Sequence, residues 1–120
     1  MKTDSTPKLI LRLKLRGGAI LGPGKIDLLE RIERLGSISA AAREMGMSYG
    51  QAWKLIETMN RAFPHPVVRK TTGGRSGGGA ALTATGRKML DCYVAMRRKA
   101  ESRIAGELRA IGRLAGGSRR

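Results

Sequence analysis

The residues of this sequence best suited to chemistry are ones that hydrogen-bond to other molecules. Gln51 and Lys54 stand three positions apart in a segment with helical spacing. A glutamine amide can pair with the edge of an adenine, and a lysine can contact guanine or a phosphate. Both residues are also ordinary on any solvated helix face. The surrounding elements must therefore decide between the two interpretations.

Catalytic groupings are not apparent. His65 is the single histidine and lies between prolines, far along the chain from Cys92, the single cysteine. We find neither paired carboxylates on one face nor the spacings of metal ligands. The glycine-rich segments match neither a P-loop nor a dinucleotide-binding turn. We therefore expect a protein that is not an enzyme and has no metal or cofactor.

The composition is strongly basic. The 120 residues include 24 Lys and Arg against 9 Asp and Glu, which gives a formal net charge of +15. Such a field attracts a polyanion, and double-stranded DNA is the favoured partner. An anionic membrane and ribosomal RNA are weaker alternatives. A signal peptide and an apolar run of about 18 residues are both missing, so we expect a cytoplasmic protein.

Residues 36–63 predict two helices joined by a tight turn. Gly46 ends the first helix, because glycine adopts the left-handed backbone at little steric cost. Ser48 begins the second, as a residue whose hydroxyl accepts a bond from a free amide. This is the outline of a helix-turn-helix, whose second helix enters the major groove, although an ordinary helical pair is the alternative. An inner stripe of Ala52, Leu55, Ile56 and Met59, with Trp53 at the edge, leaves as predicted DNA contacts Ser48, Tyr49, Gly50, Gln51 and Lys54.

Two predicted β segments flank the helices. Residues 9–16 alternate leucine with mostly basic residues, a pattern typical of a strand. Residues 67–72 and 80–82, around a glycine-rich loop at 73–79, predict a basic hairpin whose cations reach a DNA backbone. Serines at the start of the second helix could hold a phosphate. The predicted contacts here are Ser37, Ser39, Arg69, Lys70, Thr72, Arg75 and Ser76.

Residues 84–114 predict one long helix of about 45 Å. Its apolar stripe is longer than a domain of this size can cover, so a helix of a second copy is the expected partner. A frayed tail beyond residue 105 is the alternative. Cys92 on this helix is expected to be buried or half-buried. The predicted dimerisation residues are Met89, Tyr93, Met96, Ala100, Ile104, Leu108 and Ile111.

The order of these elements predicts a mainly α protein with a small β-sheet. The fold class is a winged helix-turn-helix with a long C-terminal dimerisation helix. We expect a disordered N-terminus at 1–8, a DNA-binding domain at 9–83, a dimerisation helix at 84–114 and a disordered tail at 115–120.

Particular motifs resemble a known family. Residues 36–42, GSISAAA, resemble the start of the helix-turn-helix of LysR-type regulators. Residues 47–53, MSYGQAW, and the glycine-rich segment 73–83 more narrowly resemble the molybdate-responsive ModE branch. The resemblance covers roughly residues 9–113 and implies DNA binding and homodimerisation. Full members carry a separate C-terminal domain that binds molybdate or tungstate. The sequence ends at Arg120, and molybdate binding by these residues is not expected.

The sequence thus predicts a homodimeric, sequence-specific transcriptional regulator on an inverted-repeat operator, without its own molybdate-binding domain. One alternative is an architectural DNA-binding protein with little sequence preference. Another is an interaction module that pairs with a longer regulator.

Overall fold

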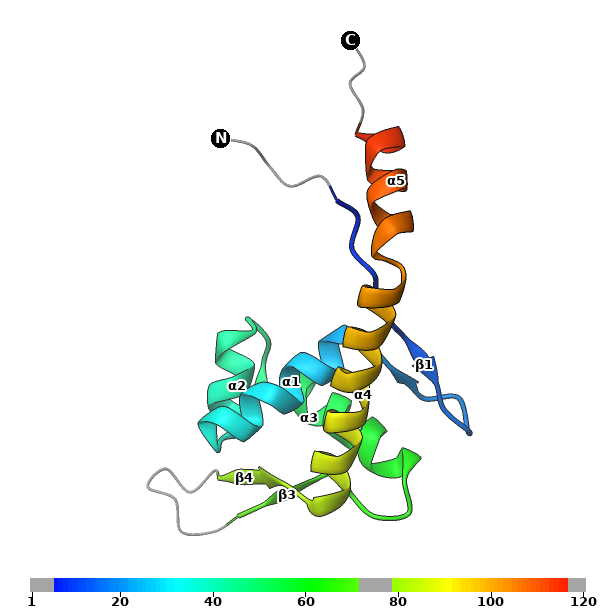
Figure 1. Cartoon of the computed structure of the whole chain (residues 1–120). Coiled ribbons are helices and arrows are strands. Elements are labelled where there is room, and N and C mark those ends of the chain that lie inside the picture. The colour runs from blue at the N-terminus through cyan, green and yellow to red at the C-terminus, as the bar shows by residue number, and fades with distance from the viewer. Residues whose placement is uncertain (1–5, 72–78, 117–120) are drawn as a thin grey trace.

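The computed structural model describes residues 6–71 and 79–116 of the chain. In these residues short β-hairpins lie on either side of a helical group, and a helical arm extends away from it (Figure 1). The fold class predicted from the sequence is confirmed. In chain order the elements are β1 (Leu13–Lys14), β2 (Ile20–Leu21), α1 (Pro23–Leu35), α2 (Ile38–Glu44), α3 (Tyr49–Ala62), β3 (Val68–Lys70), β4 (Ala80–Leu82), α4 (Ala84–Arg103) and α5 (Ala105–Ala115).

Helix α1 is the centre of the hydrophobic core. Its apolar residues recur at helical spacing, and Leu28, Leu29 and Ile32 are completely buried. The helix contacts α2, α3, α4 and β4, so one apolar stripe packs against most of the fold. Pro23 stands in the first turn, where its missing N–H leaves no bond unmade.

Helices α2 and α3 form the predicted helix-turn-helix. Gly46 has φ of +71°, the left-handed conformation that lets the chain leave α2 and turn sharply. The inner stripe of α3 is confirmed, because Ala52, Ile56 and Met59 are buried and Leu55 packs against the core. The spacing of these residues therefore fixes the face of α3 that looks outward.

The start of β3 joins three elements. Asn60, near the end of α3, accepts hydrogen bonds at Oδ1 from the backbone N–H groups of Val67 (2.7 Å) and Val68 (3.2 Å). Thr83, the N-cap of α4, donates its backbone N–H to the Val67 carbonyl (3.0 Å). Thr83 Oγ1 also donates to the Pro66 carbonyl (2.6 Å). These bonds fix the β3–β4 hairpin relative to both α3 and α4.

The predicted strand at 9–16 is mostly wrong. Only Leu13 and Lys14 pair, with Leu21 and Ile20 of β2, around a turn at Gly17. Leu11, Leu13 and Leu15 do pack against the core, and Leu11 is held by a bond from the Tyr93 hydroxyl to its carbonyl (2.6 Å). Among the described residues, this segment pairs with β2 alone. It is held mainly by its packing against the core and by the hydrogen bond from Tyr93 of α4.

The prediction of one unbroken helix at 84–114 is also wrong. Helix α4 ends at Arg103, and Ile104, at φ −102° and ψ 12°, separates it from α5. Gly106 lies just after the break, where its low helix propensity weakens continuation of the helix. Cys92 is exposed rather than buried or half-buried. No helix in the described part of the chain is long and apolar enough to cross a membrane.

The contact between Gly86 of α4 and Val67, the residue just before β3, generates a prediction. A Cβ atom on Gly86 would overlap the Val67 carbonyl oxygen and lie 2.9 Å from its carbon, both of them backbone atoms that cannot rotate aside. We expect Gly86→Ala to lower the free energy of unfolding by about 2 kcal/mol through overpacking. Denaturant unfolding would measure it. Gly106→Ala is the control, because its Cβ meets nothing within 4 Å. It should be neutral or slightly stabilising, and equal effects of the two changes would contradict the packing argument.

Candidate nucleic-acid interface

The outward face of α3 carries the predicted recognition residues. Ser48, Tyr49, Gly50, Gln51 and Lys54 are all exposed, with 43% of Tyr49 accessible. Gly50 has no side chain to hold the helix away from a surface, because only the Ser48 hydroxyl lies near its missing Cβ. The N-terminal half of α3 is therefore open to a large partner.

Gln51 has a second role that the sequence reasoning missed. Ser48 Oγ accepts from the Gln51 backbone N–H, and Gln51 Oε1 accepts from the Ser48 backbone N–H, both at 3.1 Å. This reciprocal pair is a capping box, and its signature, Ser-x-x-Gln, was present in the sequence. Bidentate pairing with adenine needs both the oxygen and the nitrogen of the amide. Gln51 must therefore leave the box to read an adenine.

The exposed face of α3 continues beyond Lys54. Thr58 and Arg61 follow at offsets of four and seven residues, which places them on the same side of the helix. Thr58 Oγ1 donates to the Lys54 carbonyl (3.0 Å), while Arg61 is exposed. The same spacing was visible in the sequence, but the predicted face ended at Lys54.

The β3–β4 hairpin places further cations beside α3. Arg69 and Lys70 are exposed, and Lys70 Nζ lies 4.5 Å from the centre of the Trp53 ring. Trp53 packs at the edge of the core as predicted, and this cation–π contact ties β3 to the middle of α3. The other predicted hairpin contacts lie outside the described residues, namely Thr72, Arg75 and Ser76.

The serines at the start of α2 differ in role. Ser37 is the N-cap, and its hydroxyl accepts from the Ala40 backbone N–H (3.0 Å). Ser37 also forms a β-bridge with Gly79, which draws the start of α2 close to the β3–β4 hairpin. Ser39 is exposed in the first turn. Of these two serines, Ser39 is the one whose hydroxyl makes no hydrogen bond to another described residue.

Ion pairs hold α1 against α2. Arg31 bonds both Asp27 (2.9 Å) and Glu44 (2.7 Å), and Arg34 bonds the same Glu44 oxygen at 2.6 Å. The hydrogen bond from Arg34, followed by that from Arg31, lowers the pKa of the Glu44 carboxyl. Bonding to Asp27 raises the pKa of the Arg31 guanidinium. These arginines are neutralised within the fold and are poor candidates for contact with a polyanion.

The predicted dimerisation residues fall into two groups. Tyr93 is 1% exposed and belongs to the core of a single chain, where burial raises the pKa of its hydroxyl. Met89 also packs against that core. Met96 and Ile111 are 43% and 54% exposed. The remaining residues are partly exposed: Ala100, Ile104 and Leu108.

Fold and site together define a winged helix-turn-helix protein. The α2–α3 pair supplies an open recognition helix, and the β3–β4 hairpin stands in the position of the wing. The chain belongs to the bacterial regulatory helix-turn-helix proteins of the lysR family, whose model matches residues 24–87.

The similar proteins include transcriptional regulators and a molybdenum-pterin-binding protein. The chain is 41% identical over 86 residues to the DNA-binding transcriptional dual regulator ModE of Escherichia coli K12, covering 72% of this chain and 33% of that protein. It is 36% identical over 94 residues to the transcriptional regulator ModE of Haemophilus influenzae, covering 78% and 37%. It is 48% identical over 81 residues to the molybdenum-pterin-binding protein MopB of Rhodobacter capsulatus, covering 68% and 30%. The chain thus spans about a third of the length of these relatives.

The shared pairing of Glu44 predicts a pH dependence. A carboxyl whose pKa is lowered by folding stabilises the fold above its ordinary pKa of 4.5, and this stabilisation is lost as the pH falls through the lowered value. We therefore expect Glu44→Gln to lower the melting temperature at pH 7 and to lower it less at pH 3. Thermal unfolding followed by circular dichroism would test this. Glu30→Gln is the control, because Glu30 is exposed and has no ion pair with any described residue. An equal deficit of Glu44→Gln at both pH values would contradict the prediction.

Proposed function

We propose that this chain binds an inverted-repeat operator as a homodimer and regulates transcription in a sequence-specific manner. The observation that carries the proposal is the exposed face of α3, where Gln51 and Lys54 stand clear of the core. A glutamine amide and a lysine ammonium are groups that read base edges in the major groove. Exposed Arg69 on the adjacent hairpin supplies a cation for the DNA backbone.

The homodimer is proposed from the apolar residues left on α4 and α5. Met96, Ile111 and Leu114 expose 43%, 54% and 84% of their surface in the single chain. On α5 the last two are three positions apart and thus share a face. A symmetric pairing of two such arms would cover these side chains and present two α3 helices to successive half-sites, about one DNA turn or a multiple apart.

Molybdate is not needed for DNA contact in this proposal. The regions that would contact DNA all belong to the helix-turn-helix and its hairpin, whereas the named relatives extend well beyond the region they share with this chain. We propose that residues 9–83 of each chain in the dimer make the DNA contacts without bound molybdate. No residue of this region is proposed as a ligand of molybdate.

One observation favours a second function. With Gln51 Oε1 engaged in the capping box, the face of α3 offers cations and little base-specific chemistry. An architectural DNA-binding protein with weak sequence preference would need no more. Selection of bound duplexes from a random pool separates the two functions. An enriched inverted repeat supports the regulator, and an unenriched pool supports the architectural protein.

Operator preference can be tested at Gln51 without disturbing the helix. Gln51→Glu retains the capping box, since glutamate also serves at this position, but a carboxylate cannot donate to an adenine. We expect Gln51→Glu combined with Lys54→Ala to reduce the ratio of operator to scrambled-DNA affinity by roughly tenfold or more, equivalent to 1–3 kcal/mol per lost pairing. Fluorescence anisotropy with both duplexes measures this ratio. Lys99→Glu, on exposed α4, is the control, because it lowers the net charge by the same two units. An unchanged ratio would show that α3 does not read the operator as proposed.

The dimer can be tested on α5. Ile111→Asp places a charge on the exposed apolar face, and we expect it to shift the sedimenting mass from twice 12.9 kDa to a single chain. Arg113→Asp, about 200° round the helix from Ile111 at 100° per residue, should remain dimeric. Analytical ultracentrifugation would distinguish the two. A wild-type protein that sediments as a monomer would refute homodimerisation through this arm.

A further inference from the structure

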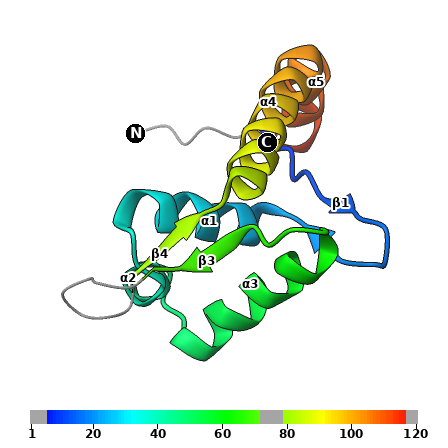
Figure 2. The same ribbon diagram turned by 90° about the horizontal axis from the view of Figure 1, so that it is seen from below.

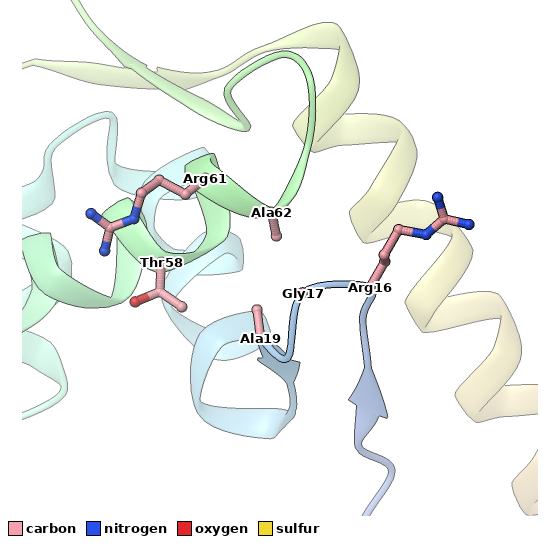
Figure 3. Close-up of a pocket in the computed structure, with 6 residues that line it drawn as sticks. All are labelled: Arg16, Gly17, Ala19, Thr58, Arg61 and Ala62. Carbon is pink, nitrogen blue, oxygen red and sulfur yellow. The ribbon is translucent and has the colours of Figure 1, made fainter.

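A shallow notch lies where the β1–β2 turn meets the C-terminal half of α3. It has a volume of about 240 Å³ and is lined by Arg16, Gly17, Ala19, Thr58, Arg61 and Ala62 (Figure 3). The two arginines come from segments 45 residues apart in the chain. The fold therefore gathers two cations next to the end of the recognition helix.

Neither arginine is neutralised by the fold. Arg16 and Arg61 are exposed, and no ion pair or hydrogen bond joins either side chain to a described residue. Arg31, Arg34 and Arg87 differ, because each pairs with a carboxylate of α1 or α2. Acidic residues are also absent from the sequence at 5–26 and at 58–90. Glu57, one turn before Arg61, is the acidic residue of α3, and it does not pair with Arg61.

The orientation of the arginines indicates an extended partner. Figure 3 shows the guanidinium groups of Arg16 and Arg61 pointing away from each other at opposite edges of the notch, with Thr58 and Ala19 between them. Two diverging cations cannot enclose one small anion. They suit separate charges of a polyanion, such as different phosphates along a DNA backbone. The Thr58 hydroxyl already donates to the Lys54 carbonyl, so Thr58 lines the notch without offering this hydrogen to the partner.

The β1–β2 turn is held firmly enough to present its cation. Leu15 donates its backbone N–H to the Ala19 carbonyl (2.8 Å), and Gly18 donates to the Leu15 carbonyl (2.9 Å). Leu15 packs against the core. Gly17 and Gly18 have φ of +93° and +100°, which only glycine adopts readily, so the tip carries no side chain and backbone can approach a surface closely.

The β1–β2 turn lies beside the C-terminal end of the recognition helix. Helix α3 runs from α2 towards the β1–β2 turn, so the turn stands beside the end of α3 that is farther from Ser48 (Figure 2). From Gln51 to Arg61 the exposed face spans ten residues, about 15 Å of helix. A duplex whose major groove holds the first half of this face would bring a flanking strand past the second half.

We propose that Arg16 and Arg61 form a second contact surface for the DNA backbone, at the end of α3 opposite its capped start. This surface binds phosphates that flank the bases read by Gln51 and Lys54, and it contributes affinity without sequence preference. The inference rests on the proposed function, because it requires α3 to lie in a DNA groove.

Salt dependence of DNA binding tests the proposal. Each phosphate contact contributes about 0.9 to the slope of log K against log salt concentration. Because the homodimer carries each arginine twice, we expect Arg16→Ala and Arg61→Ala each to reduce that slope by about 1.8 and to weaken binding roughly 60-fold at 0.1 M salt. Operator and scrambled duplexes should be affected equally, so the preference ratio should not change. Arg16→Lys and Arg61→Lys should retain most of the affinity, because a lysine ammonium also neutralises a phosphate and releases its counterion.

The outcomes separate this inference from the proposed function. Lys99→Ala is the control, since it removes the same charge from the exposed surface of α4. If Arg16→Ala and Arg61→Ala lose no more affinity than Lys99→Ala, the contact surface is refuted, while the loss of preference in the Gln51 and Lys54 variant still supports the regulator. If the arginine variants alter the preference ratio, a backbone role is refuted. If wild-type protein shows no operator preference, the proposed function itself fails.

Discussion

The rest of the structure depends on the hydrogen bonds around Val67 and Val68. Both valines are buried, and their backbone N–H groups are satisfied by a side chain, Asn60 of α3, rather than by a neighbouring strand. The Val67 carbonyl in turn accepts from Thr83 at the start of α4, and Gly86 lies so near that carbonyl that a Cβ atom would overlap its oxygen. A short hairpin alone is only marginally stable in water. Here the recognition helix, the hairpin and the arm are therefore positioned by one shared set of backbone groups.

The charges of the fold are divided in a way that the net charge alone does not reveal. Asp27 and Glu33 of α1 and Glu44 of α2 pair with Arg31, Arg34 and Arg87, and these bonds fasten α1 to α2 and to α4. By contrast, Arg16, Arg61 and Arg69 are exposed and have no carboxylate partner among the described residues. Exposed ion pairs stabilise a fold only slightly. The division leaves three unpaired arginines on or beside the recognition helix: Arg61 on α3 itself, Arg16 in the β1–β2 turn and Arg69 on β3.

Local patterns in the sequence were sufficient for the parts of the fold that local forces decide. The Ser48 cap, the Gly46 turn and the buried stripe of α3 follow from capping chemistry and helical period. Contacts between distant residues were not predictable in this way. Tyr93 fits a dimer stripe by spacing, yet it bonds to Leu11, 82 residues earlier, and is buried in one chain. The site was partly predictable for the same reason: the exposed face of α3 follows from its stripe, but Arg16 joins Arg61 only through the fold.

The capping box gives Gln51 two alternatives that compete. A helix cap of this kind contributes about 1 kcal/mol, whereas a bidentate pairing with the correct base discriminates by about 1–3 kcal/mol. In the proposed function, releasing Gln51 from Ser48 therefore costs less than a matched adenine returns. At a mismatched base the amide gains nothing by leaving, and it remains on the Ser48 N–H. The intrahelical bond would thus suppress weak, partial pairings and leave general DNA affinity to the arginines and lysines of the surface. Sequence preference and backbone affinity would then reside in separate residues of one interface.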